Sequence, residues 1–279
     1  MNLRKAAIII PNSFTLASVF CGFYAISLCA RLGEEGPEGD AIYKAAIAIM
    51  FGGFFDATDG RIARLTKTQS EFGVQLDSLA DVITFGVAPA LLVYRWALED
   101  LGRLGLLVSF LFLACGCLRL ARFNVLAAHA KEKTGKYNVG LAIPIAACAI
   151  VGLVLVNHAL GIPRPANVGL VAVMIAVLSY LMVSRVRFRS MKDLKPNRRT
   201  LAAAALIVGG AALVASRVNR PAVLIFLIGC YICLGIAEEL LFLKQRIAAN
   251  RASRRVSAEG GAAALDPAEP ALTEAAAEE

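Results

Sequence analysis

Long apolar segments recur along the chain, and short stretches rich in charged and turn-forming residues separate them. Each segment is about 20 residues long, which is the length of helix that crosses roughly 30 Å of hydrocarbon. The pattern predicts eight transmembrane helices, at residues 8–30, 41–62, 72–97, 103–127, 139–159, 166–186, 200–217 and 221–243. It therefore indicates an all-α fold, a polytopic integral membrane helical bundle that lies in a lipid bilayer.

The composition excludes the main soluble classes of protein. Of 279 residues, 58% are hydrophobic and 18% are charged, whereas a soluble domain carries about 25% charged residues. The mean hydropathy of +0.66 points the same way. A soluble globular enzyme, a secreted disulfide scaffold and a disordered protein are all inconsistent with these values, and we expect no nucleic-acid partner.

The C-terminal end differs from the rest of the chain. The last 22 residues, Ala258 to Glu279, contain six acidic residues and no basic residue, and their Ala-, Gly- and Pro-rich composition has no periodic apolar face. We therefore expect a transmembrane domain at residues 1–245 and a disordered cytoplasmic tail at residues 246–279.

The basic residues predict the orientation of the helices. Of the 29 Lys and Arg residues, 22 lie towards one side of the membrane and seven towards the other in this arrangement of helices. Because cytoplasmic loops carry an excess of Lys and Arg, both termini are predicted to lie on the cytoplasmic side. The protein itself is predicted to be integral to the inner or cytoplasmic cell membrane.

Four aspartates occur within or beside apolar segments, where an unpaired carboxylate is costly and a function is the default hypothesis. Asp56 and Asp59 are three residues apart on the second predicted helix, while Asp77 and Asp81 are four apart on the third. Each pair therefore shares one helix face, and the short connection makes the two helices antiparallel neighbours. We expect the carboxylates to converge near the cytoplasmic boundary, where an all-oxygen site suits Mg²⁺ or Mn²⁺. Two such ions could clamp a phosphoryl group.

The residues around these aspartates fit a phosphate-containing ligand. Gly60 and Gly73 would let a phosphate or ribose approach the backbone, Ala63 keeps the helix face shallow, and Arg64 offers a forked donor to phosphate.

The complete pattern is D-x-x-D-G-x-x-A-R-x₈-G-x-x-x-D-x-x-x-D, met by Asp56, Asp59, Gly60, Ala63, Arg64, Gly73, Asp77 and Asp81. With this pattern the chain resembles the CDP-alcohol phosphatidyltransferase family. The resemblance implies that an alcohol hydroxyl attacks the phosphate of a CDP-linked lipid and releases CMP, with two divalent cations bound. It implies metal ligation by all four aspartates, with Asp81 also the general base. It further implies that Gly60, Ala63, Arg64 and Gly73 bind the CDP moiety, and that the protein is a homodimer.

Flanking segments narrow the acceptor alcohol. Residues 10–26, 75–90 and 117–125 resemble the phosphatidylserine synthase branch of the family, which implies CDP-diacylglycerol and L-serine as substrates. The P-N-x-x-T element in the first segment gives Asn12 and Thr15 as candidates for nucleotide contact. A serine carboxylate needs a cation, and Arg119, Arg122 and Asn124 are candidate donors near the end of the fourth predicted helix. One departure is the segment at residues 140–148, GLAIPIAAC, where the branch has a second proline.

Three other functions remain open on the sequence. A transferase of the same family could use glycerol 3-phosphate or an inositol phosphate, which would require more clustered cations than these candidates provide. A cation-coupled transporter would place acids near mid-bilayer and would show an inverted repeat. A purely structural lipid-binding protein would tolerate the loss of Asp81.

Overall fold

A computed structural model describes residues 3–32, 38–66, 70–129, 137–162, 164–184 and 186–189, together with positions 223, 227 and 229. The chain divides into two units, residues 1–236 and 237–279, and every element below belongs to the first unit. Apart from the three single positions, the predicted helices at 200–217 and 221–243 lie outside the described residues, as does the predicted tail at 246–279.

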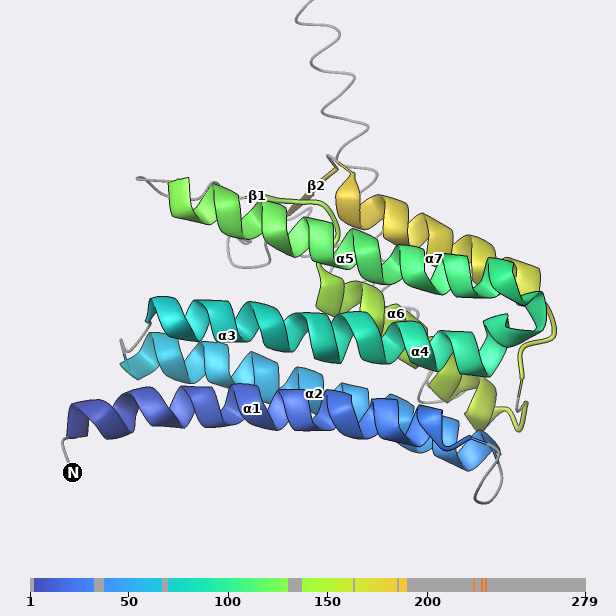
Figure 1. Ribbon diagram of the computed structural model, residues 1–279, viewed down its shortest axis with the longest axis horizontal. Coiled ribbons are helices and arrows are strands. Elements are labelled where there is room, and N and C mark those ends of the chain that lie inside the picture. The colour runs from blue at the N-terminus through green and yellow to red at the C-terminus, as the bar shows by residue number, and fades with distance from the viewer. Residues whose placement is uncertain are drawn as a thin grey trace, which may run out of the picture. The chain divides into compact units, whose positions relative to one another are not determined.

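Three long helical segments come first in the chain. Helix α1 (Leu3–Ala30) packs along α2 (Glu38–Thr66), and the two lie side by side in Figure 1. The third segment runs from Glu71 to Leu101. It consists of α3 (Glu71–Asp81), a π-helical stretch (Val82–Val87), α4 (Ala88–Val93), a second π-helical stretch (Tyr94–Leu98) and a 3₁₀ turn (Glu99–Leu101).

Three further helices complete the described part of the chain. Helix α5 (Arg103–His129) packs against α7 (Val168–Val183), and α6 (Ile143–Ala159) packs against α2. Four helical segments are long and apolar enough to cross a membrane, at Pro11–Ala30, Gly39–Thr66, Glu71–Leu101 and Arg103–Leu126. Helices α6 and α7 are apolar but shorter. The prediction of a helical membrane protein is thus confirmed, with four candidate spans among the described residues.

One short β-structure departs from the predicted all-α fold. Strand β1 (Tyr137–Val139) pairs antiparallel with β2 (Arg187–Arg189), so that Tyr137 lies opposite Arg189. Gly140 follows β1 with φ +81° and donates its backbone N–H to the carbonyl of Val186 at 2.8 Å. The predicted helix at 139–159 therefore begins later, at Ile143, because glycine readily takes the positive φ that ends the strand.

A tight helix crossing lies within the bundle at Thr84, in the first π-helical stretch. The Thr84 hydroxyl is fully buried and donates to the carbonyl of Ser18 in α1 at 3.0 Å. Gly22 of α1 and Gly52 of α2 flank Thr84 closely. A Cβ built at Gly22 would lie 2.9 Å from the Thr84 Cα, and one built at Gly52 would lie 2.5 Å from the Thr84 Cγ2. The missing side chains therefore allow α1, α2 and the third segment to approach one another.

Replacing Gly52 with alanine is expected to destabilise this crossing. Overpacking of a buried site costs about 1–3 kcal/mol, which outweighs the gain of up to about 1 kcal/mol in helix propensity, because Thr84 is fully enclosed. Gly53→Ala is the matched control, since a Cβ there would meet Phe85 at an ordinary 3.6 Å. Thermal unfolding in detergent should show a lower melting temperature for Gly52→Ala alone. Equal melting temperatures for the two variants would contradict the proposed close contact.

Candidate active site

Helix α3 begins directly after Ser70, a residue that is not among the predicted site residues. Ser70 has an extended backbone conformation and its hydroxyl accepts a hydrogen bond from the backbone N–H of Gly73 at 3.0 Å, so it is the N-cap of α3. A Cβ at Gly73 would lie 3.2 Å from the Ser70 hydroxyl and 3.5 Å from the Asn12 Oδ1. A serine directly before an acidic first turn is a usual start signal for a helix, so the sequence did contain the information. The cap fixes the helix that carries Asp77 and Asp81.

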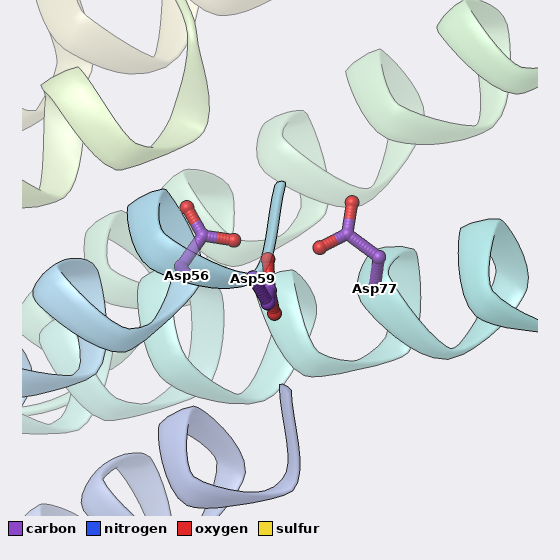
Figure 2. A group of neighbouring side chains, drawn as sticks. All are labelled: Asp56, Asp59 and Asp77. Atoms are coloured by element: carbon purple, nitrogen blue, oxygen red, sulfur yellow. The ribbon is translucent and has the colours of Figure 1, made fainter. Parts of the chain in front are cut away.

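Three of the four predicted aspartates come together. Asp56 and Asp59 lie one turn apart on α2, and Asp77 lies on α3. One carboxylate oxygen from each of the three lies within 4.8 Å of the others. Figure 2 shows Asp56 and Asp77 directing their carboxyl groups towards each other, with Asp59 between them. This group, called the aspartate cluster below, could hold a metal ion.

The three carboxylates have different partners. Asp56 and Asp77 share a side-chain hydrogen bond, which requires that one of the two carboxyl groups carries a proton and donates to the other. Asp59 is only 5% exposed, and its Oδ2 accepts a hydrogen bond from the Thr15 hydroxyl of α1 at 2.6 Å. The backbone N–H of Gly60 also donates to the Asp59 carboxylate. The Thr15 contact joins residues 44 positions apart.

Asp81 lies outside the aspartate cluster. It ends α3, one helical turn beyond Asp77, and a rise of about 1.5 Å per residue moves it roughly 6 Å along the axis. Its carboxylate is nevertheless within electrostatic reach of Asp56 and Asp77, and of the guanidinium of Arg119 in α5. Asp81 therefore interacts electrostatically both with the cluster and with the Arg119 guanidinium.

The residues predicted to bind CDP lie near the C-terminal end of α2, on α2 itself and on the parts of α1 and α3 next to it. A Cβ at Gly60 would meet open space, which leaves room beside the aspartate cluster. Ala63 is half-buried and Arg64 is exposed in the last turn of α2. Asn12 is half-buried against Gly73, whereas Thr15 is buried and bonded to Asp59.

The three candidates for the serine pocket are not equivalent. Arg119 is half-buried and interacts electrostatically with Asp81, while Arg122 is exposed. Asn124 donates its side-chain amide to the hydroxyl of Ser78 at 2.9 Å, and Ser78 in turn donates to the carbonyl of Val74 at 3.1 Å. Asn124 therefore links α5 to α3 at Ser78, the residue that follows Asp77 in the chain. Hydropathy does not reveal this contact between helices.

Comparison with known proteins identifies the family. A family model described as CDP-alcohol phosphatidyltransferase matches residues 8–186, which include all of the site described above. The chain belongs to this family. The match begins within α1 and ends after α7, so the aspartate cluster, Asp81 and Arg119 are all parts of a CDP-alcohol phosphatidyltransferase.

Three curated relatives of this phosphatidyltransferase are named CDP-diacylglycerol–serine O-phosphatidyltransferase. The Helicobacter pylori protein is 37% identical over 188 residues, covering 67% of this chain and 74% of the relative. The Bacillus subtilis protein is 34% identical over 183 residues, covering 66% and 91%. The Mycobacterium bovis protein is 31% identical over 265 residues, covering 88% of each chain.

The donor set of this phosphatidyltransferase fits a hard divalent cation. The aspartate cluster offers only carboxylate oxygens, the ligands that Mg²⁺ and Mn²⁺ prefer, whereas zinc prefers nitrogen and sulfur. Close carboxylates in an apolar helix bundle repel one another unless a proton or a cation lies between them. The cluster is thus chemically suited to a metal.

Proposed function

We infer that the protein transfers the phosphatidyl group of CDP-diacylglycerol to the hydroxyl of L-serine, which gives phosphatidylserine and CMP. The observation that carries this inference is the convergence of Asp56, Asp59 and Asp77 from two helices of a CDP-alcohol phosphatidyltransferase. The acceptor is supported by the curated relatives, which are named for transfer to serine. The same family match favours a transferase over the transporter and the structural lipid-binding protein.

We propose that the site binds two divalent cations, Mg²⁺ or Mn²⁺. Asp56, Asp59 and Asp77 would hold them, with Asp81 as a further ligand. Bound cations would supply Lewis-acid stabilisation of the charge on the phosphate oxygens. The chain's part is to present its carboxylates in a fixed arrangement within an apolar surrounding.

The proposed reaction places a proton on Asp81. The serine hydroxyl oxygen bonds to the phosphorus of the phosphatidyl group, and the bond from that phosphorus to the CMP oxygen breaks, with its electron pair leaving on CMP. The hydroxyl proton passes to the Asp81 carboxylate, which lies next to the cluster. Proximity of a carboxylate to the reacting hydroxyl is the requirement for general base catalysis.

The remaining candidates are proposed to orient the two substrates. Gly60, Ala63, Arg64 and Gly73, with Asn12 from α1, would contact the CDP moiety, and the open space at Gly60 supports this assignment. Arg119, Arg122 and Asn124 would form the serine pocket. The position of Arg119 near Asp81 favours it as the partner of the serine carboxylate, because a guanidinium binds carboxylates through a forked pair of donors.

The arrangement in the membrane is part of the proposal. The excess of Lys and Arg in alternate loops supports cytoplasmic termini and a cytoplasmic active site. A transmembrane domain at 1–245, a cytoplasmic tail at 246–279 and a homodimer remain proposals that rest on composition and on resemblance to the family.

CMP release by the purified protein tests the acceptor. With CDP-diacylglycerol and Mn²⁺ or Mg²⁺ present, we expect L-serine to drive CMP release, and glycerol 3-phosphate, inositol and inositol phosphate to give only the background rate. Omission of the metal should abolish the serine-dependent rate. Release driven by a phosphate-bearing acceptor instead would retain the transferase chemistry and overturn the serine assignment.

A further inference from the structure

The hydrogen bond between Thr15 and Asp59 connects the first helix to the aspartate cluster. Both side chains are only 5% exposed, and their oxygens are 2.6 Å apart. This distance is short for a neutral hydroxyl contact and normal for a hydroxyl that donates to a carboxylate. No other helix lies between the two groups, so α1 supports Asp59 directly.

The Thr15 hydroxyl has two acceptors within reach but only one proton to donate. A threonine inside a helix commonly donates to the carbonyl four residues earlier, which here belongs to Pro11, at 3.2 Å. The Asp59 oxygen is 0.6 Å closer than that carbonyl, and an anionic acceptor makes the stronger bond. The proton is therefore directed to Asp59.

Asp59 has hydrogen-bond donors from outside the aspartate cluster, whereas the side-chain hydrogen bond that the described residues give Asp56 and Asp77 is the one between these two carboxyl groups. Thr15 and the backbone N–H of Gly60 both donate to the Asp59 carboxylate. Asp56 and Asp77 share a hydrogen bond between themselves, a bond that they must give up when both ligate a cation. A carboxylate has about four acceptor positions, so the two donors on Asp59 leave capacity for a metal.

We propose that Thr15 is a positioning residue that fixes Asp59 as the preoriented carboxylate of the metal site. The inference rests on the proposed function, because it assumes that the aspartate cluster binds a divalent cation. It also changes the role of Thr15, which the sequence suggested as a nucleotide contact. A hydroxyl that donates to Asp59 acts on the metal through that carboxylate. Loss of a residue that orients a metal ligand typically lowers metal affinity about 10–100-fold.

Ser18 provides a matched control on the same helix. It is 1% exposed and lies one turn beyond Thr15, but its hydroxyl contacts Thr84 at 3.4 Å and no aspartate. Ser18→Ala therefore removes a buried hydroxyl from α1 at some cost in stability and leaves Asp59 supported. Thr15→Val removes the hydroxyl while keeping the branched shape of the side chain, and Thr15→Ser keeps the hydroxyl.

Mn²⁺ binding to the purified full-length protein, followed by electron paramagnetic resonance without any substrate, tests the proposal. We expect Thr15→Val to raise the dissociation constant for Mn²⁺ about 10–100-fold, and Thr15→Ser and Ser18→Ala to bind like the unaltered protein. The KM for CDP-diacylglycerol of Thr15→Val, measured at saturating Mn²⁺, should be unchanged. If Thr15→Val does not fold, Thr15→Ala serves in its place.

Three results would overturn the proposal. Unchanged Mn²⁺ affinity in Thr15→Val with a raised KM for CDP-diacylglycerol would return Thr15 to the nucleotide site. An equal loss of affinity in Ser18→Ala would show a general packing effect of α1. Absence of Mn²⁺ binding by the unaltered protein would overturn the metal part of the proposed function as well, which distinguishes that failure from the first two.

Discussion

Asp81→Asn is expected to reduce kcat by about 10²–10⁴-fold, the range that a positioned general base contributes. An asparagine has nearly the same size as an aspartate and keeps one carbonyl oxygen, so it can still act as a neutral metal ligand. It cannot accept the proton of the serine hydroxyl at neutral pH. Because Asp81 lies one turn beyond the aspartate cluster, the three clustered carboxylates should still bind a cation.

Two measurements separate loss of the base from loss of the metal. Serine-dependent CMP release should fall to near the background rate in Asp81→Asn, while Mn²⁺ binding should weaken less than in a variant of the cluster itself. Arg122→Ala is a useful comparison, because this exposed residue is proposed to affect the KM for serine and not the proton transfer. Full activity in Asp81→Asn would remove the base assignment, and another group would have to take the proton.

The sequence predicts the positions of the helices and the convergence of the acidic faces for simple geometrical reasons. Runs of about 20 apolar residues require helices in a bilayer. Spacings of three and four residues place side chains on one face, and a short connection makes α2 and α3 antiparallel. These local rules are sufficient to bring Asp56 and Asp59 opposite Asp77.

Other parts of the fold depend on contacts that no local pattern records. The π-helical stretch at Val82–Val87 has the same apolar composition as an α-helix, and β1 is too short to show alternation. The bonds from Thr15 to Asp59 and from Asn124 to Ser78 join residues 44 and 46 positions apart. The motif gives Thr15 and Asn124 as ligand contacts, but it does not reveal the hydrogen bonds that these side chains make to Asp59 and Ser78.

The position of Asp81 shows the limit of reasoning from helix faces. A spacing of four residues correctly places Asp81 on the face of Asp77, but it also displaces the side chain along the helix by one turn. The sequence motif groups the four aspartates together, whereas the structure separates three clustered carboxyl groups from a fourth, Asp81, that interacts electrostatically with Arg119. That separation is consistent with a division between metal binding and proton transfer.

Asp77→Asn is expected to abolish metal binding and activity together, in contrast to Asp81→Asn. The substitution removes one of the three carboxyl groups of the aspartate cluster, and the amide can retain a hydrogen bond to Asp56 by donating to its carboxylate. We expect the dissociation constant for Mn²⁺ to rise by more than the roughly 10–100-fold that loss of a supporting residue costs. Serine-dependent CMP release should be lost at any practical Mn²⁺ concentration.

The stability of this variant gives an independent test of the cluster. Close carboxylates in an apolar bundle repel one another in the metal-free protein, so replacing one carboxyl group by a neutral amide should leave the metal-free melting temperature unchanged or higher. Mn²⁺ should raise the melting temperature of the unaltered protein, because a ligand that binds only the folded state stabilises it. It should change the melting temperature of Asp77→Asn little. A lower melting temperature in the metal-free variant would indicate that Asp77 has a structural role. If Mn²⁺ raises the melting temperature of Asp77→Asn as much as that of the unaltered protein, Asp77 is not needed for metal binding. The metal would then bind outside the aspartate cluster.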